Sequence, residues 1–307
     1  MFFLLIVLAG GCRRALPIKD DGKINVVSVI FPSYDFARSI AGDKANIILL
    51  LPPGAESHSY EPSPMDIVTI MNSDLFIHPG GESAKWVDRI LDSIKTSGRQ
   101  IKVLRLMDLV DTVEEEIIEG MEDDGDSPDA APVYDEHVWT SLKNAKLITA
   151  SIAEALMVLD PPNAEFYMQN AANYFVQLDE LDDLFSSIVR GAKRKTIIFG
   201  DRYPFRYFSD AYALEYFAAF PGCSAETEPS ALTIAFLINK IKSEQIPVIF
   251  HIELSNEKMA DTISEATGAR KLLFNSCHNI SKKDFENGGT YLDFQKINAE
   301  NLREALW

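Results

Sequence analysis

The chain has 307 residues, of which 47% are hydrophobic and 24% are charged. This composition is typical of a globular protein and excludes a wholly disordered chain, and the length predicts two domains. The net charge of −17 disfavours nucleic acids and anionic membrane surfaces as partners and is compatible with a cationic ligand. Three cysteines are too few for a disulfide-scaffold protein.

The N-terminus has the character of an export signal. An apolar run at 2–9 precedes Gly10, Gly11 and Cys12, and it is shorter than the roughly 20 residues of a membrane-spanning helix. Small residues before a cysteine resemble the lipobox of bacterial lipoproteins. Residues 1–12 are therefore predicted to be a signal peptide, with Cys12 as the lipidated residue. An ordinary secretory signal or a hydrophobic N-terminal strand is the alternative interpretation.

Export would also permit a disulfide bond, because exported proteins mature in an oxidising environment. With Cys12 lipidated, Cys223 and Cys277 remain as an even pair, and we expect them to be bonded. Two buried free thiols are the alternative.

The first part of the chain alternates predicted strands and helices. Apolar, β-branched runs predict strands at 24–31, 46–51, 75–78 and 101–104. Helices are predicted at 34–41, 63–72 and 84–94. Ser63 is the predicted N-cap of the second of these helices, and Pro64 its first residue. The alternation is typical of βαβ units and a mostly parallel sheet.

Segment 111–136 differs from the rest, because it holds twelve acidic residues and no Lys or Arg. A block of like charges repels itself, so a mobile loop is predicted here. Weak capture of cations near a site is the functional interpretation, and a solvated insertion is the alternative.

Two helices precede a second series of strands and helices. They are predicted at 141–159 and 163–190, and apolar residues at steps of three and four form a core stripe along the longer one. Strands are then predicted at 196–199, 216–220, 247–252 and 271–275, and helices at 205–213, 229–244, 256–267 and 298–306. We predict an N-terminal α/β lobe at 24–161, a linking helix at 162–191 and a C-terminal α/β lobe at 195–307.

The five histidines are the residues most informative about chemistry. His78 and His251 end predicted strands, and His58 and His278 follow strands, which is where open α/β sheets place ligands. His137 precedes a predicted helix. Imidazoles together with carboxylates suit zinc or manganese, but no local metal motif is present. A site would therefore need the fold to bring distant residues together.

Several segments resemble, in order, the metal-binding lipoproteins of zinc and manganese ABC importers. The similarity runs from about residue 24 to 306. The segments are PGAESHSYEP at 53–62, DIVTIMNSDL at 66–75, DEHVWTS at 135–141, DPPNA at 160–164, SAETEPS at 224–230, NEKMADTISEATG at 256–268 and TYL at 290–292. The resemblance implies two Rossmann-like α/β lobes with mostly parallel sheets, joined by one long rigid helix, and one metal ion in the cleft between them.

The resemblance also implies which residues bind the ion. His58 and His137 match the first two histidine ligands of the family. The third ligand position falls on Arg202, which cannot bind a cation, and a shift of one residue offers Asp201. The fourth position, a carboxylate after a strand, falls on Glu253.

Other residues near these positions keep alternative roles. His251 is the rival of Glu253, and Glu56 is a further candidate ligand. Glu56 or Glu61 could instead hydrogen-bond a ligand histidine and fix its tautomer. His78 and His278 match no ligand of the family, and we interpret both as structural residues or residues at the rim of the site.

The function implied is that of a lipid-anchored, monomeric solute-binding protein on the outer side of the cytoplasmic membrane. It would capture Zn²⁺, or alternatively Mn²⁺, and deliver it to a membrane ABC permease without catalysing a reaction. Three alternatives remain: a zinc hydrolase-like metalloenzyme, a binding protein for an organic solute, and an adhesin with the same fold.

Overall fold

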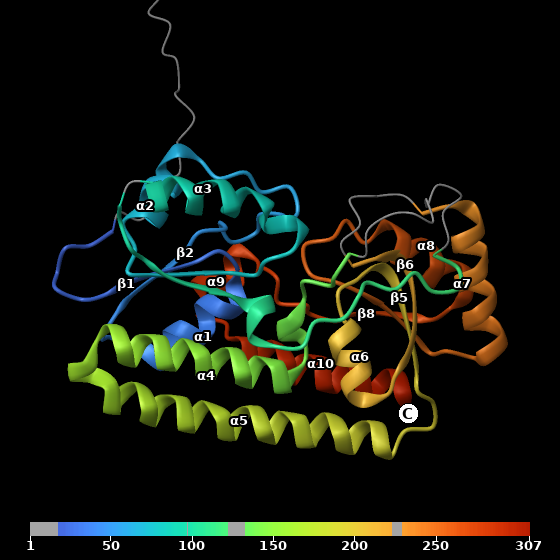
Figure 1. Ribbon diagram of the computed structural model, residues 1–307. Coiled ribbons are helices and arrows are strands. Elements are labelled where there is room, and N and C mark those ends of the chain that lie inside the picture. The colour runs from blue at the N-terminus through green and yellow to red at the C-terminus, as the bar shows by residue number, and fades with distance from the viewer. Residues whose placement is uncertain (1–17, 97, 122–132, 223–228) are drawn as a thin grey trace, which may run out of the picture.

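Two parallel four-stranded sheets organise the protein, shown as a computed structural model in Figure 1. The first sheet has the order β2-β1-β3-β4 and the second the order β6-β5-β7-β8, which is the same order within each half. The strands are β1 (Asn25–Ser28), β2 (Asn46–Leu49), β3 (Leu75–His78), β4 (Lys102–Arg105), β5 (Thr196–Tyr203), β6 (Glu215–Pro221), β7 (Val248–His251) and β8 (Arg270–Leu273). This topology confirms the predicted α/β fold class. The structure describes residues 18–96, 98–121, 133–222 and 229–307.

Helices connect the strands and cover the sheets. They are α1 (Phe31–Ala41), α2 (Pro64–Met71) and α3 (Lys85–Thr96) in the first half, and α6 (Arg206–Tyr212), α7 (Ala231–Glu244) and α8 (Lys258–Thr267) in the second. Ser63 and Asp66 form a capping box at α2, which confirms Ser63 as its N-cap. Helix α1 begins earlier than predicted, because Pro32 lies in its first turn, where proline is tolerated, and does not end the strand.

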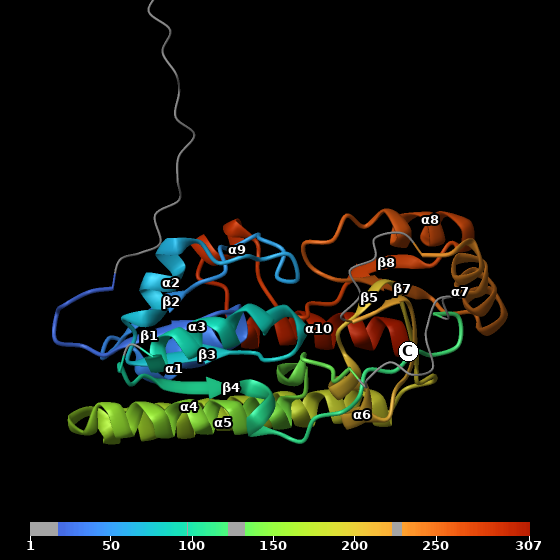
Figure 2. The same cartoon turned by 45° about the horizontal axis from the view of Figure 1, so that its top comes forward.

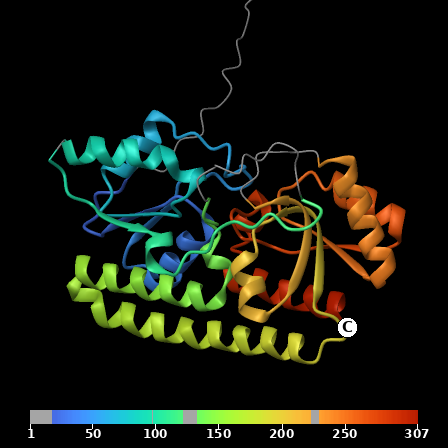
Figure 3. The same ribbon diagram turned by 45° about the vertical axis from the view of Figure 1, so that its right-hand side comes forward.

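A helical hairpin joins the halves. Helix α4 (Leu142–Leu159) turns at Asp160 into α5 (Ala164–Arg190), a 27-residue helix that lies along one side of both halves in Figures 1 and 3. Helix α5 contacts α1 and α4 in the first half and α6 and α10 in the second. The predicted long helix is thus observed, and one core contains buried residues from both halves. The predicted lobe boundaries stay a prediction.

After β8 the chain crosses back to the first half. Gly54 N donates to the carbonyl of Ile280 at 2.8 Å, and Asn279 Nδ2 donates to that of Pro52 at 2.8 Å. Helix α9 (Lys282–Glu286), which was not predicted, then lies over the first half (Figure 2). Residues 276–286, assigned by prediction to the C-terminal lobe, therefore contact the N-terminal half.

Helix α10 (Tyr291–Leu306) returns the chain to the second half and begins well before the predicted residue 298. Thr290 caps it, because its hydroxyl accepts a hydrogen bond from Asp293 N at 3.1 Å. No helix among the described residues is long and apolar enough to cross a membrane.

The acidic segment is held at both of its described ends, and the mobile loop predicted for residues 111–136 stays a prediction. Glu115 N donates to the carbonyl of Val133 at 2.7 Å, and Val113 N donates to Tyr207 Oη at 3.2 Å. Glu116 forms an ion pair with Arg206. Val113 and Glu116 thereby contact the second half, whereas Glu136 accepts a hydrogen bond from Ser83 of the first half. Residues 122–132 lie outside the described residues.

Two of the three cysteines, Cys12 and Cys223, lie outside the described residues. Cys277 is fully buried and has no disulfide partner among the described residues, and its sulfur accepts a hydrogen bond from Gln295 Nε2 at 3.8 Å. The expected bond between Cys223 and Cys277 stays a prediction.

His78, at the end of β3, makes the stability of the protein depend on pH. Its ring stacks on Phe76 at 5.5 Å, and burial, with a smaller contribution from Arg105, lowers its pKa from 6.5 to about 4. Between pH 6.5 and 4 the unfolded chain binds a proton here and the folded chain does not. The free energy of unfolding therefore decreases as the pH is lowered through this window, by about 3 kcal/mol at most. Urea unfolding of the metal-free protein at pH 7.5 and 4.5 should show a smaller loss for His78→Phe than for wild type. Equal losses would contradict this assignment.

Candidate metal site

Three histidines from distant parts of the sequence converge between the two halves. His58 lies in the loop after β2, His137 immediately precedes the 3₁₀-helix η3 (Val138–Thr140), and His278 lies in the segment after β8. The ring centroids are 5.8 Å apart for His58 and His137, 5.2 Å for His58 and His278, and 5.3 Å for His137 and His278. Together with Glu136, each residue offers one ligand atom, and these four atoms lie within 4.8 Å of one another.

His137 is oriented by the residue two positions before it. Asp135 Oδ1 lies 2.8 Å from His137 Nδ1 and also accepts the backbone N–H of His137 at 2.8 Å. Both residues are buried. A carboxylate that accepts the Nδ1 proton fixes the tautomer in which Nε2 is unprotonated, and this is a common arrangement at metal-binding histidines.

Two neighbouring residues, Ser57 and Trp139, contact the His278 ring. Ser57 Oγ lies 3.2 Å from His278 Nδ1, and the indole ring of Trp139 lies edge-on to the imidazole with centroids 4.9 Å apart. Its Nε2 is buried and has no hydrogen-bond partner among the described residues. A buried nitrogen in this state is costly, and a bound cation would satisfy it.

His58 lies in a loop that is hydrogen-bonded to the crossing segment, residues 276–286, which leads from β8 back to the first half. Asn279 Nδ2 donates to the carbonyls of Pro52 and Ala55, and the Glu56 carboxylate accepts His58 N at 3.2 Å. Gly54 adopts a φ of +84°, which suits glycine at this turn. These contacts direct the His58 ring toward Glu136, whose Oε1 lies 3.9 Å from His58 Nδ1.

Glu136 is a fully buried carboxylate beside the imidazoles. Its Oε2 accepts Ser83 N at 3.1 Å, whereas its Oε1 has no hydrogen-bond partner among the described residues. Burial raises its pKa above the ordinary 4.5. Gly81 allows this side chain to pack, because a Cβ at that position would lie 2.4 Å from Glu136 Oε2.

Burial favours the neutral form of two of the imidazole rings in the cluster, those of His58 and His278. Burial lowers the pKa of His58 to about 3, helped by the charges of His137 and Arg202. Burial likewise lowers the pKa of His278 well below 6.5. Neutral imidazole is the form that binds a metal ion, so these two rings are ready to act as ligands at neutral pH.

The structure brings two of the predicted ligands into this cluster and gives the others different partners. His58 and His137 are members. Asp201, on β5, accepts Arg202 N at 2.9 Å and Ile252 N at 3.3 Å, and it lies outside the cluster. Its neighbour Arg202 lines the same pocket as the histidines and pairs with Glu56 at 3.3 Å. A guanidinium thus occupies the place where the resemblance implied a third ligand.

Glu253 and His251, the candidates for the fourth ligand, also lie outside the cluster. Glu253 accepts hydrogen bonds from Ser276 and from His278 N, and burial raises its pKa to about 7. His251 Nδ1 lies 3.2 Å from the carbonyl oxygen of Ile252 and 4.0 Å from Glu257 Oε1. Glu61 is exposed.

Two members of the cluster, His278 and Glu136, were not predicted as ligands. The sequence predicts His278 as a structural residue or a residue at the rim of the site, although it follows a strand in the same way as the other candidates. Glu136 was treated as part of the solvated acidic segment. Its position between Asp135 and His137 was the available signal, because neighbouring residues outside regular helices and strands can face the same ion.

The pocket at the cluster is small. Its cavity volume is about 30 Å³, far below the roughly 300–1,000 Å³ of sites for drug-sized organic ligands. This size fits an ion and disfavours an organic solute.

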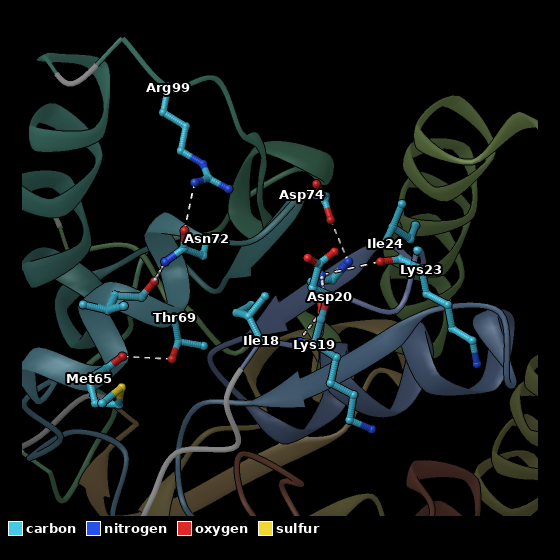
Figure 4. A pocket seen from close by; sticks show the side chains of 13 residues that line it. Ile18, Lys19, Asp20, Lys23, Ile24, Met65, Thr69, Asn72, Asp74 and Arg99 are labelled. Atoms are coloured by element: carbon cyan, nitrogen blue, oxygen red, sulfur yellow. Dashed lines mark hydrogen bonds between the residues drawn. The ribbon is translucent and has the colours of Figure 1, made fainter.

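A larger hollow of about 690 Å³ lies in the first half, around residues 18–25 and α2 (Figure 4). It contains no histidine or cysteine. Arg99, one of its polar side chains, donates a hydrogen bond to Asn72 Oδ1 at 2.9 Å. We assign it no metal.

Comparisons with known proteins agree with this geometry. The profile of the ZnuA family, described as the periplasmic component A of the zinc-uptake complex, matches residues 26–305. The Bacillus subtilis high-affinity zinc uptake system protein ZnuA is 30% identical over 99% of this chain and 94% of that protein. The Streptococcus pneumoniae zinc-binding lipoprotein AdcA is 31% identical over 93% of this chain, which spans only 56% of AdcA.

Among solved structures, the Zn(II)-bound ZnuA-like domain of S. pneumoniae AdcA superposes with a TM-score of 0.75. It is 27% identical, and the match covers 93% of this chain and 99% of that one. The match of the family profile to nearly the whole chain establishes the relationship. The chain belongs to the ZnuA family of periplasmic zinc-uptake components, the zinc-binding solute-binding proteins of ABC importers.

Proposed function

We propose that His58, Glu136, His137 and His278 hold one Zn²⁺ ion as the transported cargo. The observation that carries this proposal is the buried Glu136 carboxylate, whose Oε1 lacks a hydrogen-bond partner among the described residues and lies 3.9 Å from an imidazole nitrogen. Isolating a carboxylate from water in this way costs several kcal/mol unless a cation compensates it. A divalent ion at this point would satisfy the carboxylate and the buried Nε2 of His278 together.

The donor set favours zinc over manganese. Three imidazoles and one carboxylate match the tetrahedral nitrogen and oxygen ligands of zinc, whereas manganese prefers sites richer in oxygen ligands. Zn²⁺ also binds nitrogen ligands more tightly than Mn²⁺ at equilibrium. Manganese therefore stays a weaker alternative cargo.

Binding without turnover is the activity that this set supports. Zinc enzymes leave one coordination position open for water or substrate, and four protein ligands would fill a tetrahedral shell. We propose that the protein captures zinc on the outer side of the cytoplasmic membrane, as a monomer anchored through Cys12, and passes the ion to an ABC permease.

Removing any of the three imidazoles should weaken zinc binding by more than about 100-fold, because loss of an outer-shell partner alone typically costs 10- to 100-fold. Calorimetric titration of the chelator-stripped His58→Ala, His137→Ala and His278→Ala variants measures this loss. His251→Ala and Asp201→Ala are the matched controls, since both residues lie near the pocket and outside the cluster. A large loss in Asp201→Ala with none in His278→Ala would refute the proposed ligand set.

Glu136→Gln should separate metal binding from folding. The amide keeps the size of the side chain and removes the buried charge, so the metal-free variant should be at least as stable as wild type at pH 7.5. The sign follows from the raised pKa, because the folded protein holds the proton more tightly than the unfolded chain and loses stability as pH rises. The rise in melting temperature on adding zinc should be smaller than in wild type. An unchanged zinc-induced rise would show that Glu136 is no ligand.

A further inference from the structure

The turn that carries His278 has an unusual backbone. Cys277, between Ser276 and His278, is fully buried and adopts a φ of +61°, in the left-handed region. This conformation costs a residue with a side chain about 1–2 kcal/mol, so neighbouring interactions must stabilise it.

Glu253, just beyond the end of β7, supplies those interactions. Its Oε2 accepts Ser276 N at 2.7 Å, and its Oε1 accepts Ser276 Oγ at 2.6 Å and His278 N at 3.1 Å. The carboxylate therefore binds donors on both sides of Cys277. Hydrogen bonds to a charged acceptor are about twice as strong as neutral ones, which suits them to hold a strained turn.

The same turn is attached to the first half of the molecule. Trp139 Nε1 donates to the carbonyl of Ser276 at 2.8 Å, and Phe31 N donates to that of His278 at 3.3 Å. Glu253 provides the attachment to the second half through β7. The position of the His278 ring thus depends on a carboxylate that is not itself a member of the cluster.

We propose that Glu253 is a positioning residue, which holds the 276–278 turn so that the His278 imidazole meets the ion bound by His58, Glu136 and His137. This inference rests on the proposed function. It gives Glu253 a role different from the ligand role that the sequence suggested. It also makes Glu253 the link through which β7 of the second half acts on a site otherwise contacted mainly from the first.

A double-mutant cycle on zinc affinity tests the proposal. The dissociation constant for Zn²⁺ is measured by chelator competition for wild type, Glu253→Gln, His278→Ala and the double variant. Glu253→Gln should weaken binding about 10- to 100-fold in the wild-type background and change it less than about 2-fold in the His278→Ala background. A purely structural role would lower affinity similarly in both. Equal effects in the two backgrounds, or no effect in either, would overturn the proposal.

The cycle distinguishes a failure of the proposed ligand set from a failure of the positioning role of Glu253. If His278→Ala binds zinc as tightly as wild type, the proposed ligand set fails. If His278→Ala loses affinity and Glu253→Gln does not, only the positioning role fails. Glu257→Gln is the matched control, because Glu257 follows the same strand and pairs with Lys271 away from the pocket, and it should bind zinc as wild type does.

Two additional measurements make the result independent of folding. Ser276→Ala removes one of the three hydrogen bonds to Glu253 and should weaken zinc binding several-fold. This variant tests the positioning role if Glu253→Gln does not fold. The visible spectrum of the Co²⁺-substituted protein reports coordination directly. Glu253→Gln should shift the spectrum toward that of His278→Ala, and an unshifted spectrum with weakened binding would contradict the positioning role.

Discussion

The burial of two imidazoles and one carboxylate beside a partly buried third imidazole is the constraint on which the site depends. His137 and Glu136 are fully buried, and His278 is nearly so, within a cluster whose four ligand atoms lie less than 5 Å apart. Without an ion such a cluster is unfavourable, because Glu136 Oε1 and His278 Nε2 are buried and have no hydrogen-bond partner in the part of the chain that the structure describes. With a divalent cation the same burial strengthens every bond to it.

The fold tolerates this cluster because rigid elements surround it. The loop with His58 and the segment with His278 each follow a parallel strand. Asn279 of the second segment donates two hydrogen bonds to backbone carbonyls of the first. Helix α5 contacts helices of both halves, and the buried core is continuous along it. The residues that we propose as ligands are therefore held in place by the surrounding protein, which would reduce the ordering cost of binding an ion.

Because of the crossing segment 276–286, the two halves contribute unequally to the cluster, which differs from a site shared evenly between two lobes. Three of the four cluster residues belong to the first half, and the fourth arrives on a segment bonded to both halves. The second half contributes Arg202 and Glu253 to the pocket wall, and both act on the ligands through neighbours. Motion between the halves would reach the ion mainly through the 276–278 turn.

The sequence predicted the architecture well because local patterns determine it. Alternating apolar runs and helical stripes located all eight strands and the long helix. His58 and His137 were found because each lies in a contiguous family motif. The presence of His278 and Glu136 in the cluster was not predicted, for a physical reason: it depends on the crossing of the chain after β8 and on burial within an acidic segment, and neither is encoded by local periodicity. Glu253 was selected as a carboxylate after a strand, a pattern that cannot distinguish a ligand from a residue that supports one.

X-ray absorption spectroscopy at the zinc edge, on protein loaded with one equivalent of Zn²⁺, tests the central claim most directly. We expect a four-coordinate ion with three imidazole nitrogens and one carboxylate oxygen, all at about 2.0–2.2 Å. A shell of two imidazoles with two carboxylates would point to Asp201 and Glu253 and would contradict it. A water-rich shell without imidazole scattering would place the ion on the acidic segment and contradict it more completely.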